Sequence, residues 1–355
     1  MFTWIGISAA FLAALLLTPV AIRLARKYNI VDVPNGRKVH STPTPRMGGI
    51  AIYAGFVLGS LLLAVYTRQV ACLLVGSSIV MLTGLIDDVK DISPKLKLLG
   101  QVLGALVLVY GGFTIRFITN PFNGSMISLG FMAVPITVVW LVGISNAVNL
   151  IDGLDGLCSG VSMIAALSTA VVCISQGEFT AAALAGVLAA AALGFLRYNF
   201  NPAKTFMGDC GALFLGFVLG ALSLMGLSKG STVISVFIPF IILGIPVFDT
   251  FCAIFRRVYL KKPIFAADKM HLHQTLLSMG LSHRQTVLTI YALALLMGIS
   301  AVLMAILSTA QATVVLILVA CFTFLCADFL GVLRGKQAAW LSRQLAKRKN
   351  SVDHS

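Results

Sequence analysis

Eleven long apolar runs, separated by short polar segments, follow one another along the chain. Each is close to the roughly 20 residues that an α-helix needs to cross a bilayer, and we interpret the runs as helices. The predicted spans are 2–22, 47–66, 70–86, 98–112, 131–149, 157–174, 179–196, 211–227, 232–253, 287–307 and 310–331. The pattern predicts an all-α, polytopic integral membrane protein with about eleven transmembrane helices.

Composition agrees with this interpretation. Hydrophobic residues make up 59% of the 355 positions and charged residues only 11%, whereas soluble domains carry about 45–50% and about 25%. A soluble globule with so few charges could not cover its surface, so soluble, disulfide-rich secreted and disordered classes are excluded. We expect a transmembrane domain over 1–333 and a basic cytoplasmic tail over 334–355.

The net charge of +14 reflects topology rather than nucleic-acid binding. When the segments between spans are assigned alternately to two sides, all 26 Lys and Arg residues fall on one side except Arg68, Arg116 and Lys229. Basic residues gather in cytoplasmic loops. We therefore expect the N-terminus outside and the C-terminus in the cytoplasm, with no nucleic-acid partner.

Two local patterns concern the helices themselves. GxxxG pairs such as Gly55 and Gly59 are typical of closely packed transmembrane helices. The ninth span contains Pro239, Gly244 and Pro246, which predict a kink or a break. A break there would open a groove toward the cytoplasmic face.

Only 12 residues are acidic, and most of them gather at the predicted cytoplasmic face. They are Asp87, Asp88, Asp91, Asp152, Asp155, Asp209 and Asp268, with Asp249 near the inner end of its span. Carboxylates at membrane depth are costly and usually mark a functional site. So many at one face would repel one another without a cation, and a hard ion such as Mg²⁺ suits their oxygens.

For Asp91 and Asp268, helix capping or pairing with a neighbouring lysine is as good an explanation as a functional site. The adjacent charges of Asp87 and Asp88, at the end of an apolar span, are a poor choice for stability alone. A metal among carboxylates, with Lys and Arg nearby, is the usual arrangement for phosphoryl transfer. At the inner membrane face, one substrate would be a lipid and the other cytosolic, so the residues predict a metal-dependent lipid phosphotransferase.

Five ordered segments on the predicted cytoplasmic side resemble the polyprenyl-phosphate N-acetylhexosamine-1-phosphate transferases. That family includes phospho-MurNAc-pentapeptide translocases and the enzymes that initiate teichoic acid and O-antigen-type glycans. The matching segments are 37–49, 87–91, 146–157, 199–209 and 271–273. The resemblance implies that a polyprenyl phosphate oxygen attacks the β-phosphate of a UDP-sugar, so that sugar-1-phosphate moves to the lipid and UMP leaves.

The resemblance also implies roles for the acidic residues and their neighbours. Asp209 matches the family's magnesium ligand, and Asn149 lies where an amide oxygen assists the metal. Asp87 and Asp88 match the pair that deprotonates or orients the lipid phosphate. Asp87 would act as a base or as a covalent nucleophile, and we favour the base. Mg²⁺ is the expected cofactor, with Mn²⁺ as the alternative.

Four residues are implied at the nucleotide. Asp155 and Phe206 match positions that hydrogen-bond and stack on uracil. Asn199 and Asp152 border the same pocket.

A histidine-rich loop is implied at the phosphates of the sugar nucleotide. His271 and His273 match this loop, but Gln274 stands where many family members have another histidine. That departure weakens the case for a fully cationic loop. Lys38 and Arg256 are the further residues expected to bind substrate.

Within the family, we favour UDP-GlcNAc as the sugar donor and undecaprenyl phosphate as the acceptor. The segment 41–49 differs from the translocase motif, and the run 31–40 resembles enzymes that start wall teichoic acid. A phospho-MurNAc-pentapeptide translocase is the alternative. The expected location is a bacterial plasma membrane with the site facing the cytoplasm. The sequence does not give the oligomeric state, and a homodimer is compatible with it.

Proteins of other classes share single features with this chain. The Asp152-Gly-Leu-Asp155-Gly run resembles the start of the CDP-alcohol phosphatidyltransferase signature, but the second half of that signature does not follow. An ion-coupled transporter also gathers carboxylates, although normally near the bilayer midplane and across inverted repeats. A purely structural scaffold would not need Asp87, Asp88 and Asp209.

Overall fold

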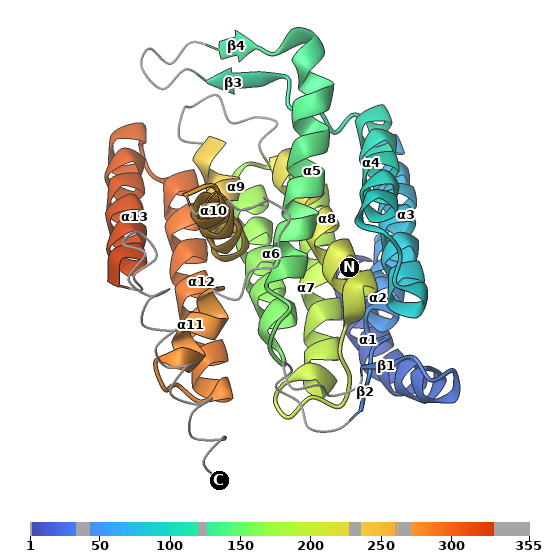
Figure 1. Cartoon of the computed structure of the whole chain (residues 1–355). Coiled ribbons are helices and arrows are strands. Elements are labelled where there is room, and N and C mark those ends of the chain that lie inside the picture. The colour runs from blue at the N-terminus through green and yellow to red at the C-terminus, as the bar shows by residue number, and fades with distance from the viewer. Residues whose placement is uncertain are drawn as a thin grey trace, which may run out of the picture.

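The apolar runs fold into a bundle of long helices joined by short connections (Figure 1). The computed structural model describes residues 2–32, 43–119, 126–226, 236–259, 261 and 271–329. Its helices are α1 (Phe2–Lys27), α2 (Gly49–Leu62), α3 (Arg68–Lys90), α4 (Pro94–Gly111), α5 (Ala133–Leu150), α6 (Leu157–Ser175), α7 (Phe179–Asn199), α8 (Gly208–Gly226), α9 (Phe237–Ile242), α10 (Gly244–Tyr259), α11 (Leu272–Ser278), α12 (His283–Ile306) and α13 (Thr309–Phe329).

Short strands and a 3-10 turn complete the described structure. Strand β1 (Val31–Asp32) pairs antiparallel with β2 (Thr44–Pro45), and β3 (Phe117–Thr119) pairs antiparallel with β4 (Met126–Ser128). The 3-10 turn, η1 (Gly130–Met132), leads into α5. The two strand pairs lie at opposite ends of the bundle (Figure 1).

Nine helices of the described residues are long and apolar enough to cross a membrane. The protein is therefore an all-α polytopic membrane protein, as the pattern predicts. Two of the eleven predicted spans take another form. The run 47–66 forms α2, whose 14 residues extend only about 21 Å, less than the roughly 30 Å of a bilayer core.

The other exception is the predicted span 232–253, which is broken as its prolines and glycine predict. Helix α9 ends at Ile242, Leu243 leaves the helical conformation, and α10 begins at Gly244. Pro239 and Pro246 each lie in the first turn of their own helix, where a missing N–H leaves no bond unmade. Figure 1 shows α10 nearly end-on while the long helices run up the page, so the chain turns sharply at the break.

Close packing at glycine also follows the prediction. A Cβ on Gly55 would lie 2.7 Å from the carbonyl oxygen of Ala10, and a Cβ on Gly59 would lie 2.7 Å from that of Gly6. Helices α1 and α2 therefore touch backbone to backbone, as GxxxG pairs allow.

Helix α8 is the core of the bundle and packs against α2, α3, α5, α6 and α7. Its Phe214 ring makes edge-on contacts with Tyr53 and Phe56 of α2, each at 5.5 Å between ring centroids. Helix α8 is buried nearly throughout. Its first turn is therefore surrounded by the neighbouring helices. The helices also run further than predicted there, so that Asp87, Asp88 and Asp209 lie in helical turns rather than in connections.

Candidate active site

The short turn between α3 and α4 places a carboxylate beside a lysine. Asp91 ends α3 in the left-handed region, at φ 47°, and the side chain of Ser93 caps the first turn of α4. The chain reverses within three residues, so Lys97 of α4 returns to the last turn of α3. Its Nζ lies 3.0 Å from Oδ2 of Asp87.

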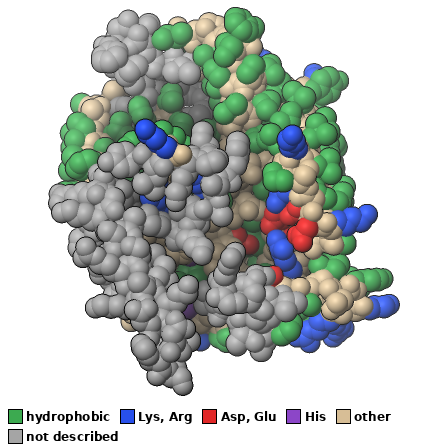
Figure 2. Space-filling model, in the orientation of Figure 1, with side chains coloured by type: hydrophobic (Ala, Val, Ile, Leu, Met, Phe, Trp, Pro, Cys, Tyr) green, Lys and Arg blue, Asp and Glu red, His purple; other side chains and the backbone are tan. Residues whose placement is uncertain are grey.

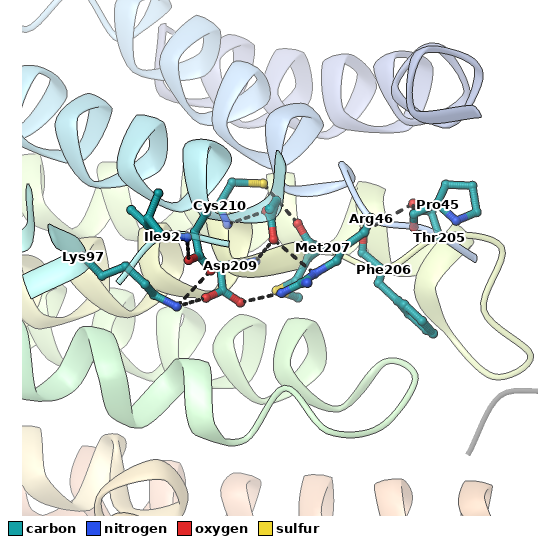
Figure 3. Close-up of polar contacts among 11 residues, drawn as sticks. Pro45, Arg46, Ile92, Lys97, Thr205, Phe206, Met207, Asp209 and Cys210 are labelled. Atoms are coloured by element: carbon teal, nitrogen blue, oxygen red, sulfur yellow. Dashed lines mark hydrogen bonds and ion pairs between the residues drawn. The ribbon is translucent and has the colours of Figure 1, made fainter. Parts of the chain in front are cut away.

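Two cations join the carboxylates of α3 to the carboxylate of α8 (Figure 3). Lys97 Nζ contacts Asp209 Oδ2 as well as Asp87. Arg46, which follows β2, places Nη2 at 2.9 Å from Asp209 Oδ1 and Nε at 3.1 Å from Asp88 Oδ1. These five residues, here called the ion-pair cluster, hold three negative and two positive charges.

Asp88 is the most deeply buried member of the cluster, and its side chain is 0% exposed. Its Oδ1 accepts the N–H of Asp209 at 2.8 Å, and its Oδ2 accepts the N–H of Cys210 at 3.0 Å. Asp88 therefore caps α8 from another helix and satisfies amides that a helix N-terminus leaves free. Gly208 has φ +72°, and a Cβ there would lie 2.4 Å from Asp88 Oδ2, so a larger residue would displace the cap.

The segment that carries Arg46 is bound to the segment that precedes α8. The carbonyl of Pro45 accepts the N–H of Phe206 at 2.8 Å and the hydroxyl of Thr205 at 2.9 Å. In return, the N–H of Gly48 donates to the carbonyl of Phe206 at 3.0 Å. This pairing brings two of the sequence segments together, and the Phe206 ring points away from the ion-pair cluster (Figure 3).

A pocket of about 380 Å³ opens beside the cluster, within the usual size of small-molecule sites. It brings together seven of the predicted site residues: Asn149, Asp152, Asp155, Asn199, Phe206, Asp209 and His273. They come from the end of α5, the α5–α6 turn, the end of α7, the connection before α8, the start of α8, and α11.

Asp155 and Asn199 shape this pocket as well as line it. Asp155 Oδ2 accepts Nδ2 of Asn201 at 3.0 Å, which holds the α7–α8 connection. Asn199 is 2% exposed; its Oδ1 accepts the hydroxyl of Ser159 at 2.8 Å, and its Nδ2 donates to the carbonyl of Thr205 at 3.0 Å. These contacts bind the α5–α6 turn to the residues before α8.

The carboxylates that line the pocket carry more charge than its cationic side chains can balance. The pKa of Asp152 is raised to about 7, mainly by burial and also by the charges of Asp209, Asp88 and Asp155, while the charge of Arg46 lowers it. A carboxyl pKa rises in this way where like charges are not fully compensated. A bound cation would relieve the repulsion.

Two oxygen ligands for such a cation face the pocket, the carboxylate of Asp209 and the side-chain amide of Asn149. Among the described residues, no three His, Cys, Asp or Glu side chains form a group that could hold a metal ion. Mg²⁺ is usually bound by one or two carboxylates together with substrate phosphates and waters. The donor set fits an ion that the protein and its substrate hold jointly.

Asp87, Asp88 and His271 are not among the described residues that line the pocket. Asp88 contacts the lining residue Arg46, and Lys97 joins Asp87 to the lining residue Asp209. His271 Nδ1 lies 2.8 Å from Asp249 Oδ2.

The remaining predicted substrate-binding residues lie outside the pocket lining or outside the described residues, whereas His273 lines the pocket. Arg256 is buried in α10, 7% exposed, and is not part of the described pocket lining. Lys38 and the predicted tail over 334–355 lie outside the described residues. His273 does line the pocket, and burial lowers its pKa to about 4, so it is uncharged at neutral pH.

The prediction omitted several residues of the site. Arg46 stands inside the first matching segment, and Lys97 follows a Ser-Pro helix start after the paired aspartates, which is a usable signal. Gln274, which follows the matched His273, and His283 line the pocket from α11 and α12, and no sequence pattern connects His283 with the distant carboxylates.

Comparison with known proteins places this geometry in a family. Residues 70–227 match the model of glycosyl transferase family 4. The chain is 47% identical over 296 residues to the probable undecaprenyl-phosphate N-acetylglucosaminyl 1-phosphate transferase of Bacillus subtilis, with 83% of each protein covered.

More distant relatives cover the chain to a similar extent. Decaprenyl-phosphate N-acetylglucosaminephosphotransferase of Mycobacterium tuberculosis is 35% identical over 318 residues, covering 81% of this chain and 78% of the relative. Phospho-N-acetylmuramoyl-pentapeptide-transferase of Halalkalibacterium halodurans is 31% identical over 316 residues, covering 82% and 94%. The chain belongs to glycosyl transferase family 4.

Proposed function

We propose that this protein transfers GlcNAc-1-phosphate from UDP-GlcNAc to undecaprenyl phosphate and releases UMP, as the first membrane step of a cell-wall or surface glycan. The observation that carries the proposal is the ion-pair cluster beside a pocket lined by seven of the expected residues. The name of the Bacillus subtilis relative supports undecaprenyl phosphate as the acceptor and GlcNAc-1-phosphate as the transferred group.

The reaction exchanges one pyrophosphate linkage for another. An oxygen of undecaprenyl phosphate attacks the β-phosphorus of UDP-GlcNAc and forms a new P–O bond. The bond from that phosphorus to the bridging oxygen breaks, and its electrons leave with UMP. Where the acceptor phosphate still carries a proton, Asp87 accepts it. Asp87 is the less buried member of the pair, with a side chain 9% exposed against 0% for Asp88.

Asp209 and Asn149 would hold Mg²⁺ in this pocket. When bound, the ion supplies positive charge that stabilises the phosphate oxygens during transfer. Arg46 lines the same pocket, and its guanidinium fork suits phosphate oxygens. Asp88 would keep the first turn of α8 in place and so orient the Asp209 carboxylate.

The proposed location is a bacterial plasma membrane, with the pocket at the cytoplasmic face. The distribution of Lys and Arg supports this orientation, since basic residues concentrate on the side that carries the site. A nucleotide sugar made in the cytosol and a lipid phosphate in the membrane would then meet at the same end of the bundle.

Purified protein in detergent tests the proposal directly. It is incubated with undecaprenyl phosphate, Mg²⁺ and labelled UDP-GlcNAc, and both lipid-linked label and UMP are measured. We expect equal amounts of the two products, and none with EDTA. Asp209→Asn should lose at least about a hundredfold in rate, because it removes a metal-binding charge, while its thermal unfolding stays close to that of the wild type.

Other outcomes would change the assignment in a defined way. Product from UDP-MurNAc-pentapeptide and none from UDP-GlcNAc would favour the function of the Halalkalibacterium relative. A stable Asp209→Asn protein with near-native turnover would remove the metal-ligand role. Inactivity with every UDP-sugar, in assays with sound lipid controls, would favour a transporter.

A further inference from the structure

Asp249 is a buried carboxylate separate from the ion-pair cluster. It lies in α10 and is 3% exposed. Its Oδ2 is 2.8 Å from Nδ1 of His271, and its Oδ1 accepts the N–H of Leu272 at 2.8 Å. Leu272 is the first residue of α11, so both oxygens of Asp249 hold the start of a helix that lies elsewhere in the sequence.

His273, the next residue of α11, lines the pocket. Its ring lies parallel to that of His271, with 5.9 Å between centroids and 1° between planes. A Cβ added to Gly153 would lie only 2.4 Å from His273 Nε2. The ring therefore lies close to the α5–α6 turn, and its place depends on where α11 begins.

The two faces of α10 have different surroundings. Phe251 and Phe255 are 65% and 48% exposed, and their rings stack at 6.4 Å. Asp249 and Cys252, on the opposite face, are buried, and α10 packs against α5 and α12. The contact of Asp249 with α11 thus connects a surface helix to the pocket wall.

We propose that Asp249 is a positioning residue for the sugar nucleotide: it fixes His271 and the first amide of α11, and thereby holds His273 in the pocket wall. The inference rests on the proposed function, because it assumes that the pocket takes a uridine nucleotide. Asp249 does not touch that nucleotide, so its effect passes through His273.

Binding of UDP, measured by calorimetry in detergent with Mg²⁺, tests this dependence. Asp249→Ala should weaken UDP binding about tenfold, the size of one lost polar contact. The same substitution should cause no further loss in a His273→Ala background, because the two residues act as one unit. Cys252→Ala, buried on the same face of α10 one turn further on, is the matched control and should bind like the wild type.

Equal losses in both backgrounds, or no loss in either, would overturn the proposal. Hydrogen exchange of the ligand-free protein supplies a readout that does not need the nucleotide. Exchange of the α11 amides should accelerate in Asp249→Ala and not in Cys252→Ala; unchanged exchange in α11 would also overturn the proposal. Faster exchange in α11 with no UDP binding by the wild type would support the positioning role and contradict the proposed function.

Discussion

Asp87 and Asp88 are adjacent in the sequence, yet their carboxylates have different partners. Asp87 contacts Lys97 of the next helix, and its Oδ1 accepts the N–H of Ile92 at 3.1 Å. Asp88 accepts two amides of α8 and the guanidinium of Arg46. A carboxylate with three donors and no exposed surface is poorly placed to accept a proton from a substrate. The geometry therefore favours Asp87 for proton transfer and Asp88 for positioning.

His273 should make the stability of the protein sensitive to acid. Its pKa is lowered to about 4, mainly by burial and also by His271 and His283, while Asp249 opposes the shift. An unfolded histidine titrates near pH 6.5, so the unfolded state binds more protons between pH 6.5 and 4. The free energy of unfolding should then fall as the pH decreases through this window, by at most about 3 kcal/mol.

Thermal unfolding in detergent at pH 7.5 and 4.5 measures this effect, with His273→Gln as the comparison. The wild type should lose more stability on acidification than the variant. Carboxylates titrate in the same range in both proteins, so the difference isolates His273. Parallel decreases in the two proteins would show that His273 is protonated normally in the folded state.

At the scale of elements, two helices that carry pocket residues are capped from elsewhere in the chain. Asp88 of α3 binds the first amides of α8, which carries Asp209. Asp249 of α10 binds the first amide of α11, which carries His273. In both cases a buried carboxylate supplies the acceptors that a helix N-terminus needs. The capping carboxylates thus fix the helices on which the pocket residues lie, and in this way orient those residues.

The cap on α8 should contribute measurably to stability. Asp88→Asn keeps the size of the side chain but offers one acceptor oxygen and places an N–H₂ group against amide and guanidinium donors. Leaving such groups unpaired costs about 1–3 kcal/mol, so the unfolding temperature should decrease by several degrees. Differential scanning measurements in detergent test this, with the exposed Asp91→Asn as the control. An unfolding temperature equal to that of the control would remove the capping role.

The sequence predicted helices more completely than contacts. Nine of the long apolar runs became membrane-length helices because burial and bilayer length act on the run itself, and the break near Gly244 followed from local backbone chemistry. The pairing of Arg46 with Asp88 and Asp209 could not be predicted in this way, because it needs the contact between the segment after β2 and the residues before α8. His271 was placed with its neighbour at the substrate, although its ring faces Asp249.

At the scale of the whole molecule, the surface separates into an apolar and a charged part. Figure 2 shows hydrophobic side chains over much of the described surface on this face, and acidic side chains in one patch beside Lys and Arg. Helix α13 has little buried surface, and it exposes large apolar residues such as Leu318 and Phe324. A bilayer would cover such a surface and leave the charged patch at its edge.

We expect the broken ninth span to give the lipid acceptor a route to that edge. Helix α10 turns away from the direction of the long helices (Figure 1), and Phe251, Phe255 and Val258 expose 65%, 48% and 59% of their surface. Its opposite face reaches α11 through Asp249. A long prenyl chain that lies along the exposed face would bring its phosphate toward the pocket, which predicts that α10 contacts the acceptor.

Photo-crosslinking with a diazirine-bearing polyprenyl phosphate, followed by mass spectrometry of the peptides, tests this route. We expect adducts on residues 244–259 that unlabelled undecaprenyl phosphate removes by competition. Helix α13 is an internal control, because its apolar residues are equally exposed and should take up label without competition, as a surface in contact with bulk lipid would. Competed adducts on other helices and none on α10 would place the acceptor elsewhere, and the break would then be a feature of packing alone.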